Sequence, residues 1–420
     1  MTSVLSNATR SPGLPGEVVP RPKVLVLAST FPSVVDPILG VFVKERMRSV
    51  AALGRCDLRV VSPTAYFPPL KIHPRWYPNS QIPRQDVVDG LQVDRPRYLM
   101  LPKTNGRFTS RLMYHGIRGR VRRLYREFPF NVVDSHFVFP DGVVGAHLAE
   151  EFGVPLVITA RGVDLMEFPK YPVPRRQISW ALQKATRLIA LSEELARKMV
   201  ELGADPAKIT VISNGVDTDA FQPEDQAEAR RRLGLPLDRR IILGVGYLIE
   251  RKGFHLAIEA LSRIHQKHPD AMYVVAGGLG RFNGDFSRQI QETIDRTGMA
   301  EHVRLLGEKR HDEVHHCYNA ADYFAVLSAY EGSPNAPMEA LACGVPVISA
   351  PTGSMPELMQ HPGLGILLKD REVATIAEGF DRALEMKFDR TAIRDWAETQ
   401  SWRQVARRAN DVIDSAIATR

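Results

Sequence analysis

Short apolar runs alternate with helical patterns along most of this 420-residue chain, and the alternation occurs in two successive series. Apolar strands separated by amphipathic helices are typical of parallel sheets that helices cover on both faces. The sequence therefore predicts an α/β protein with two doubly wound domains, which fits a prior of about 100 to 200 residues per domain. The runs that predict strands are 23–30, 57–62, 133–137, 156–160, 187–192 and 209–213 in the first series, and 241–248, 272–278, 303–307, 323–328 and 345–350 in the second.

Breaks in this rhythm predict the domain boundaries. Residues 1–22 contain four prolines and too little apolar surface to offset the entropy of ordering, so we expect a flexible tail there. A first domain spans 23–213, a turn-rich linker with Asn-Gly and proline spans 214–225, and a second domain spans 226–388. The C-terminal residues, 389–420, have helical spacing and are expected to pack back on the first domain.

Residues 64–98 interrupt the first series. Their sequence YFPPLKIHPRWYP is too rich in proline for an interior strand, so this segment is interpreted as a long excursion from the sheet.

Composition restricts the class of protein. With 44% apolar and 25% charged residues, the chain is an ordinary globular protein rather than a fibrous or disordered one. It has no apolar run of about 18 residues and no secretion signal, so we expect a cytoplasmic protein. The three cysteines, Cys56, Cys317 and Cys343, are too few and too far apart for a disulfide framework and are interpreted as reduced thiols.

Charge is unevenly divided along the chain. Residues 1–205 carry 29 Lys and Arg against 18 Asp and Glu, whereas the rest of the chain is slightly acidic. Eight basic and no acidic residues lie between Lys103 and Arg126, beside an apolar stripe of helical period. A packed helix with a solvated basic face explains this pattern, and so does a helix that docks on an anionic membrane surface. Nucleic acid is disfavoured as a partner because aromatic residues do not interleave with these charges.

Two adjacent cations follow the first strand of the second domain. Arg251 and Lys252 stand where that strand passes into a helix, and Gly253 follows them. An arginine fork, a lysine and a helix N-terminus can together hold a pyrophosphate. A solvated turn is the competing interpretation, because Arg-Lys pairs are common.

The segment YFAVLSAYEGSPNAPMEALACGVPVISA is the most specific in the chain. A strand ends near Ser328, a loop carries Glu331, and a helix is expected to begin about Pro337. Glu331 and Glu339 would then both face the crevice at the carboxyl ends of the strands, where open sheets bind ligands, and could accept hydrogen bonds from sugar and ribose hydroxyls. Alternatively, Glu339 only complements the helix dipole.

The first domain offers further candidates at strand ends. His136 ends a predicted strand, where it could bond a substrate hydroxyl or shuttle a proton, although a satisfied core histidine is the more frequent case. Arg161 and Asp164 follow the next strand and face the same crevice. Gly40 stands at a helix N-terminus, where the absence of a side chain permits close approach to a diphosphate.

Five motifs occur in order: DSHFVFPDG, ARGVD, ISNGVD, GYLIERKGF and the glutamate pair of EGSPNAPMEALACGVPVI. Together they resemble the retaining glycosyltransferases of family four, which have the GT-B fold. The resemblance covers roughly residues 23–418. It implies two facing Rossmann-like domains, a C-terminal crossover helix, a nucleotide-sugar donor held mainly by the second domain, and no cofactor or metal ion.

The resemblance also implies roles for individual residues. Arg251 and Lys252 would hold the donor diphosphate and stabilise the leaving group, Glu331 would bind the transferred sugar, and Glu339 the ribose. His136 would lie beside the sugar, and Arg161 and Gly40 near the donor. The base would lie against Gly307, Glu308 and Lys309, mainly through their backbone. Ser333 and Asn335 belong to the same donor loop, although Ser333 stands where an aromatic residue is frequent and Pro337 removes one backbone donor from the helix start.

The implied reaction transfers a sugar from a nucleotide diphosphate to a glycan or lipid-linked acceptor, in the synthesis of a cell-surface polysaccharide. Retention could follow from front-side attack or from a carboxylate nucleophile, and the first is favoured because no nucleophile is evident in the first domain. A nucleotide-sugar epimerase or hydrolase on the same fold is the alternative enzyme. A non-catalytic binder of membranes or nucleic acid is the alternative from another class. His311, His315 and His316 have a spacing compatible with metal ligation but lack a clear acidic or cysteine partner, so no metal site is predicted.

Overall fold

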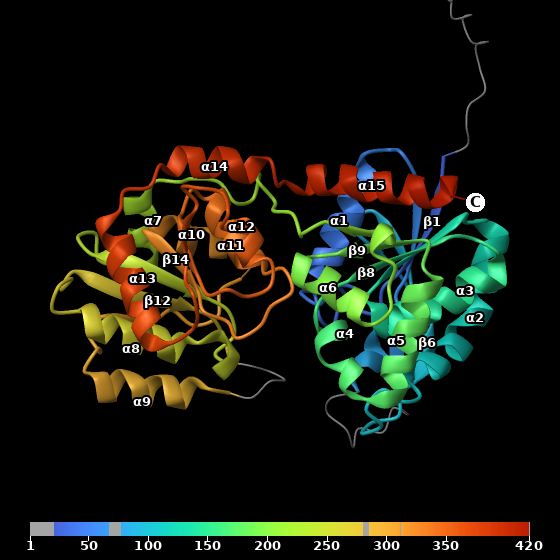
Figure 1. Cartoon of the computed structure of the whole chain (residues 1–420), viewed down its shortest axis with the longest axis horizontal. Helices are drawn as coiled ribbons and strands as arrows, with labels where there is room; N and C mark the ends of the chain where they lie inside the picture. The colour runs from blue at the N-terminus through green and yellow to red at the C-terminus, as the bar shows by residue number, and fades with distance from the viewer. Residues whose placement is uncertain (1–20, 67–76, 280–284, 311, 420) are drawn as a thin grey trace, which may run out of the picture.

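The computed structural model describes residues 21–66, 77–279, 285–310 and 312–419, which form two α/β domains side by side (Figure 1). The tail predicted at 1–22 lies almost entirely outside the described residues. The first domain contains an eight-stranded sheet that is parallel except for its last strand pair. In spatial order its strands are β10 (Ile209–Val211), β9 (Arg187–Ala190), β8 (Leu156–Ala160), β7 (Val132–His136), β1 (Lys23–Leu27), β2 (Asp57–Val61), β5 (Leu91–Asp94) and β4 (Gln85–Val88).

Helices cover both faces of this sheet, as the alternating pattern predicts. The long helix α2 occupies the residues expected from its apolar stripe, and its Met113, Ile117 and Val121 are buried in the core. The helices and helical turns of the domain are α1 (Val41–Ala52), η1 (Pro78–Gln81), α2 (Thr109–Glu127), η2 (Val138–Gly142), α3 (Val143–Phe152), α4 (Val163–Met166), η3 (Phe168–Lys170), α5 (Pro172–Lys184), α6 (Glu193–Glu201) and η4 (Pro206–Lys208).

The interpretation of residues 64–98 as an excursion from the sheet is partly wrong. β5 pairs with β2 in the main sheet, and β4 pairs antiparallel with β5 as an edge hairpin. Asp89 and Gly90 form the turn with φ angles of 47° and 82°, the left-handed geometry that an Asp-Gly hairpin turn requires. β3 (Thr64–Tyr66) and β6 (Arg97–Leu99) form a separate parallel pair, and residues 67–76 lie outside the described residues.

The second domain is built on a six-stranded parallel sheet. Its strand order is β13 (Val303–Leu305), β12 (Ala271–Ala276), β11 (Arg240–Val245), β14 (Tyr323–Val326), β15 (Val347–Ser349) and β16 (Gly365–Leu367). β11 and β14 are neighbours, which brings the loops that follow them together. The helices and helical turns are α7 (Gln226–Leu233), η5 (Glu250–Lys252), α8 (Phe254–Ile264), α9 (Ser287–Thr297), α10 (Val314–Ala320), α11 (Asn335–Ala342), α12 (Met355–Leu358) and α13 (Val373–Glu385).

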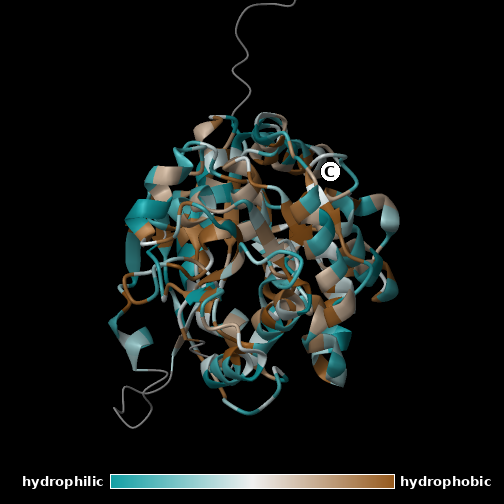
Figure 2. Cartoon of the chain, turned by 90° about the vertical axis from the view of Figure 1, so that its left-hand side faces the viewer, coloured by the Kyte–Doolittle hydropathy of each residue, from teal (hydrophilic) through white to brown (hydrophobic). Residues whose placement is uncertain are grey.

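Each sheet has an apolar layer on both faces, and these layers form the cores of the domains. Figure 2 shows the apolar colour concentrated on the inner strands and the polar colour on the outer helices. The two cores share no sheet, so the domains meet through loops, the linker and the C-terminal helices.

The two C-terminal helices belong to different domains. α14 (Arg390–Glu398) packs Ile393 and Ala397 into the core of the second domain. α15 (Trp402–Ala418) crosses to the first domain, where Val405 and Ile413 pack in the same core as Met47 of α1 (Figure 1). Only α15 therefore packs back as expected for 389–420.

Candidate functional site

The carboxyl-end loops of the two sheets touch at a pair of glycines. Gly162 follows β8, and Gly332 follows β14. A Cβ atom on Gly332 would lie 2.4 Å from the Arg161 carbonyl oxygen, and one on Gly162 would lie 3.3 Å from the Gly332 Cα. No side chain fits at Gly332, so the backbones of the two domains are in direct contact beside the residues predicted to bind the donor.

Arg251, Lys252 and Glu331 converge on one point of the second domain. Arg251 Nη1 donates a hydrogen bond to Glu331 Oε1 at 2.7 Å, and Lys252 Nζ donates to the same oxygen at 2.8 Å. The cations lie in η5 after β11, and Glu331 lies in the loop after β14. The three side chains are between 15% and 23% exposed, so they are half-buried and still accessible to a ligand.

The charge state of Glu331 follows from these contacts. Burial raises the pKa of the Glu331 carboxyl, but the charges of Lys252 and Arg251 outweigh burial and hold the pKa below its usual value. Glu331 is therefore an anion at neutral pH. Arg251 also donates to the Tyr330 carbonyl oxygen at 2.7 Å, and its guanidinium lies 5.1 Å from the centre of the Tyr330 ring. Beside Arg251, a cavity of about 600 Å³ is also lined by His255 and Arg371.

The rest of the donor loop leads into α11, which begins at Asn335 rather than near Pro337. Glu339 consequently lies in the second turn and not in the first, which weakens the interpretation that it only complements the helix dipole. Its carboxylate accepts a hydrogen bond of 2.7 Å from the Tyr318 hydroxyl. Ser333 and Asn335 both contact Asn214 of the linker, at 3.3 Å and 3.0 Å.

Three loops of the second sheet lie against one another at its carboxyl edge. A Cβ atom on Gly277 would lie 1.8 Å from the Gly246 carbonyl oxygen, and the Gly277 amide donates to the Gly307 carbonyl at 2.9 Å. Gly307 has a φ of 72° and, like Glu308, is exposed, whereas Lys309 is half-buried. The residues predicted to face the base thus follow β13, at the same edge as Arg251, while 280–284 of the neighbouring loop lie outside the described residues.

Gly40 caps α1 in a left-handed conformation with a φ of 71°. A Cβ atom there would lie 2.2 Å from the Thr30 carbonyl oxygen, so the loop after β1 closes on the helix start with room only for glycine. The structure places Gly40 at the carboxyl edge of the first sheet.

His136 is fully buried at the end of β7. Arg161 Nη2 lies 2.7 Å from its Nδ1, and because arginine can only donate, Nδ1 accepts and the proton resides on Nε2. Nε2 faces Asp134 Oδ2 at 3.4 Å. Burial lowers the pKa of His136 to about 4, against the opposing charge of Asp134. The structure therefore shows a neutral, buried histidine whose Nδ1 is hydrogen-bonded and whose Nε2 lies near Asp134 without forming a hydrogen bond.

Arg161 is 7% exposed and faces the linker rather than open solvent. Its Nη1 donates to Asn214 Oδ1 at 3.0 Å, and its guanidinium lies 4.9 Å from the centre of the Phe42 ring. Asp164, one turn further along, accepts hydrogen bonds from the backbone amides of Val138, Arg161 and Gly162. Asp164 therefore holds the loops after β7 and β8 together instead of facing a ligand.

Sequence reasoning missed two buried residues near this edge. Asp141 accepts hydrogen bonds from the Ser29 amide and hydroxyl, both at 2.7 Å, and ties the loop after β1 to η2. Arg46 of α1 is 1% exposed and donates to the Ile212 carbonyl oxygen at 3.3 Å. Asp141 follows a proline in the motif DSHFVFPDG, which was the available signal, whereas nothing in the pattern around Arg46 distinguishes it from a surface residue.

The described residues contain two clusters with metal-ligand chemistry, and neither includes Arg251, Lys252 or Glu331. In the first, His315 and His316 of α10 contact the two carboxylate oxygens of Glu224 at 3.1 Å and 2.8 Å, and Arg232 lies 3.3 Å from His316. In the second, which consists of His268, Asp381 and Glu385, the Lys267 ammonium contacts both carboxylates. A neighbouring cation disfavours a metal ion in each. His311 lies outside the described residues.

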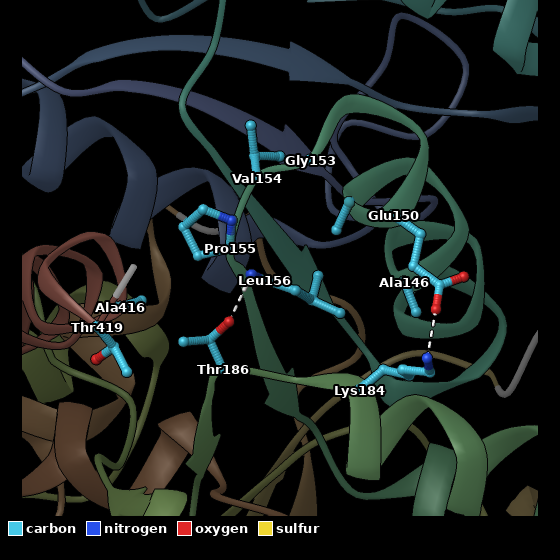
Figure 3. A pocket seen from close by; sticks show the side chains of 11 residues that line it. Ala146, Glu150, Gly153, Val154, Pro155, Leu156, Lys184, Thr186, Ala416 and Thr419 are labelled. Carbon is cyan, nitrogen blue, oxygen red and sulfur yellow. Dashed lines mark hydrogen bonds and ion pairs between the residues drawn. The ribbon is translucent and has the colours of Figure 1, made fainter.

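A cavity of about 290 Å³ lies at the opposite, amino end of β8 (Figure 3). Its charged residues, Lys184 and Glu150, are paired with each other at 2.6 Å, and Thr186 Oγ1 accepts a hydrogen bond from the Leu156 amide. The polar groups drawn there are satisfied within the first domain, and the cavity contains none of the predicted site residues.

Two facing Rossmann-like domains, with the carboxyl-end loops of both sheets in contact, form a GT-B fold. The family model described as Glycosyltransferase Family 4 matches residues 43–220, and the model described as Glycosyl transferases group 1 matches 225–400. The chain thus belongs to the glycosyltransferases of the family-four type, as the motifs indicated. No helix among the described residues is both long and apolar enough to cross a membrane.

Curated relatives are similar over most of the chain. TuaC of Bacillus subtilis is 28% identical over 86% of this chain and 88% of its own. Its name describes it provisionally as a teichuronic acid biosynthesis glycosyltransferase. The D-inositol 3-phosphate glycosyltransferase of Mycobacterium tuberculosis (strain F11) is 31% identical over 61% of this chain, and the match spans only 54% of that relative.

Solved structures share the fold. HepE of Anabaena, in complex with UDP, superposes with a TM-score of 0.73 at 18% identity, over 94% of this chain and 100% of that one. Sucrose-phosphate synthase of Thermosynechococcus elongatus gives a TM-score of 0.75 at 19% identity, over 96% and 100%. These likenesses establish the two-domain architecture.

Proposed function

We propose that this glycosyltransferase transfers a sugar from a nucleotide-diphosphate sugar to a glycan or lipid-linked acceptor in cell-surface polysaccharide synthesis, with retention and without a metal ion. The observation that carries the proposal is the convergence of Arg251 and Lys252 on Glu331 at the carboxyl edge of the second sheet. The complexes of Anabaena HepE with UDP and with UDP-glucose, and the name of TuaC, support the donor and the acceptor class.

The chemistry requires countercharge at the leaving group. Breaking the bond between sugar and phosphate develops negative charge on the departing diphosphate, and cations that are already in place stabilise that charge without reorganisation. Arg251 and Lys252 would supply it, and Glu331, an anion between them, would orient the transferred sugar. Two fixed cations make a divalent ion unnecessary in this scheme.

Front-side attack is the stereochemical route that the first domain supports. A double displacement requires a carboxylate that can reach the sugar. Asp134, Asp141 and Asp164 lie near the ligand edge of this domain, and each is at most 3% exposed and engaged with neighbouring protein groups. Asp36, in the loop that carries Gly40, is half-buried and accepts a hydrogen bond from the Leu39 amide at 3.2 Å. In the proposed route the leaving phosphate accepts the proton of the acceptor hydroxyl.

The test is transfer from a panel of nucleotide sugars, with chelator present throughout. Lys252→Met should lower kcat by about 100-fold or more, the usual cost of removing one preorganised stabilising group. Lys267→Met is the matched control, because Lys267 pairs with Asp381 and Glu385 on the outside of the same domain. Wild-type turnover by Lys252→Met would refute the site, and consumption of donor without an acceptor would indicate a hydrolase or epimerase instead.

Docking on an anionic membrane from the cytoplasmic side forms part of this proposal. Lys103, Arg107 and Arg111 near the start of α2 are exposed, and Leu101 and Phe108 beside them are 39% and 40% exposed. Cations beside exposed apolar side chains are typical of membrane-surface sites. Arg107→Glu with Arg111→Glu should abolish flotation with phosphatidylglycerol vesicles, whereas Arg288→Glu on α9 should not. Equal flotation with phosphatidylcholine vesicles would contradict an electrostatic attachment.

A further inference from the structure

Asn214 lies in the linker and hydrogen-bonds to both domains. It is 3% exposed, and its Oδ1 accepts from Arg161 of the first domain at 3.0 Å. Its Nδ2 donates to Asn335 Oδ1 at 3.0 Å and to the Ser333 carbonyl oxygen at 3.3 Å, both in the second domain. The amide cannot be reversed, because its NH2 group would then face the guanidinium.

Arg161 is fixed from the other side by His136. One Nη of Arg161 donates to Asn214 and the other to His136 Nδ1 at 2.7 Å, so the two ends of the guanidinium are occupied. Asp134 faces the opposite ring nitrogen of His136. A continuous polar chain therefore runs from β7, through Arg161 and Asn214, to the start of α11.

This chain ends beside the donor loop. Ser333 directly follows Gly332, whose backbone touches the Arg161 carbonyl oxygen, and Glu331 precedes it. The position of Glu331 relative to the first domain thus depends on the same few contacts that link the domains.

We propose that Arg161 and Asn214 form an interdomain clasp that holds the donor loop against the first domain, and that His136 is a positioning residue acting through Arg161. In this arrangement His136 transfers no proton. Its neutral ring orients the guanidinium, which orients the linker amide, which fixes the spacing between the two sheets.

A measurement of the distance between the domains tests the clasp. This measurement does not require the protein to be enzymatically active. Cysteines introduced at exposed Glu127 and Arg288 report this distance by fluorescence energy transfer, because the native cysteines are all buried. Asn214→Ala should raise the ratio of open to closed molecules by about fivefold or more, the effect of losing about one net hydrogen bond. Arg161→Met should do the same, and the double variant should open little further, because both changes break one chain.

Two pairs of variants separate the clasp from general destabilisation. Asn335→Ala should open the domains, whereas Asn335→Asp keeps an acceptor for Asn214 Nδ2 and should not. Arg187→Met is the matched arginine control, since Arg187 donates to Ser415 and Thr419 without contacting the second domain. If Arg161→Met does not fold, Asn214→Ala and the Asn335 pair still decide the question.

Donor binding supplies a second measurement, and this part rests on the proposed function. Affinity for a nucleoside diphosphate should fall by the same factor as the closed fraction, because only closed molecules are competent. Unchanged energy transfer in both Asn214→Ala and Arg161→Met would overturn the clasp. Opened domains in a protein that transfers no sugar from any donor would support the clasp and refute the proposed function alone.

Discussion

Replacing Asp141 by asparagine removes a buried titrating carboxyl while keeping its shape and its contacts. The Ser29 amide can donate to the new carbonyl oxygen, and the Ser29 hydroxyl can accept from the new NH2 group. Burial raises the pKa of the Asp141 carboxyl to about 7, and the hydrogen bonds from Ser29 oppose this only in part. The substitution therefore isolates the electrostatic cost of one ion in the first domain.

The sign and size of the effect follow from proton linkage. Between pH 3.8 and about 7, the folded state holds one proton that the unfolded chain has lost. The free energy of unfolding of the wild type therefore falls as the pH rises through this window, by about 4 kcal/mol in all at about 1.4 kcal/mol per pH unit. About 3 kcal/mol of this fall lies above pH 5, and Asp141→Asn should lack it.

Hydrogen exchange measured by mass spectrometry, on peptides that cover β7 to α3, gives the opening free energy of this region at each pH. The opening free energy of Asp141→Asn, relative to wild type, should rise by about 3 kcal/mol from pH 5 to pH 8. Asp270→Asn is the control, because a hydrogen bond from Arg240 holds the pKa of Asp270 below its usual value and the difference should stay constant over this range. A constant difference for Asp141→Asn as well would refute the assignment of a raised pKa.

Two glycine substitutions test the close approaches at the site, and a third, on α2, tests a position without one. Gly40→Ala combines a left-handed backbone with a 2.2 Å overlap, so it should cost more than about 2 kcal/mol and lower the midpoint of thermal unfolding. Gly332→Ala places a methyl group against the Arg161 carbonyl oxygen, so it should increase the open fraction in the energy-transfer assay while leaving the unfolding midpoint nearly unchanged. Gly119→Ala on α2 meets no atom within 4 Å and should stabilise the protein by about 0.5 to 1 kcal/mol; a loss of stability there would contradict the geometry.

The fold was largely predictable because its strands are short apolar runs with helices between them. β1 and β7 are buried on both faces, and such strands need no partner information to be found. The β4–β5 hairpin was missed because prolines nearby dominated the interpretation, although Asp89-Gly90 is a hairpin signal in its own right. The start of α11 was misplaced by two residues because proline is also acceptable at the third position of a helix, where its missing N–H has no intrahelical partner.

The convergence of Arg251 and Lys252 on Glu331 was predictable for a topological reason. Arg251 and Glu331 are 80 positions apart, yet each follows a parallel strand, and parallel strands all end at one edge. The interdomain side was not predictable in this way. Asn214 was identified only as part of a linker, because its four hydrogen bonds depend on the relative placement of two domains, which no local pattern encodes.

The charges at the donor edge explain why the cations and a carboxylate occur together. Arg251 and Lys252 lie close to the same oxygen and would repel each other if that oxygen were neutral. Glu331 offsets this repulsion and fixes both side chains, so the cluster keeps a net charge of about +1 in a half-buried setting where charges are weakly screened. A more exposed pair of cations would lose its geometry to side-chain entropy. The carboxylate thus holds the two cations in place without any ligand, and in the proposed function this is the arrangement that would stabilise a departing diphosphate.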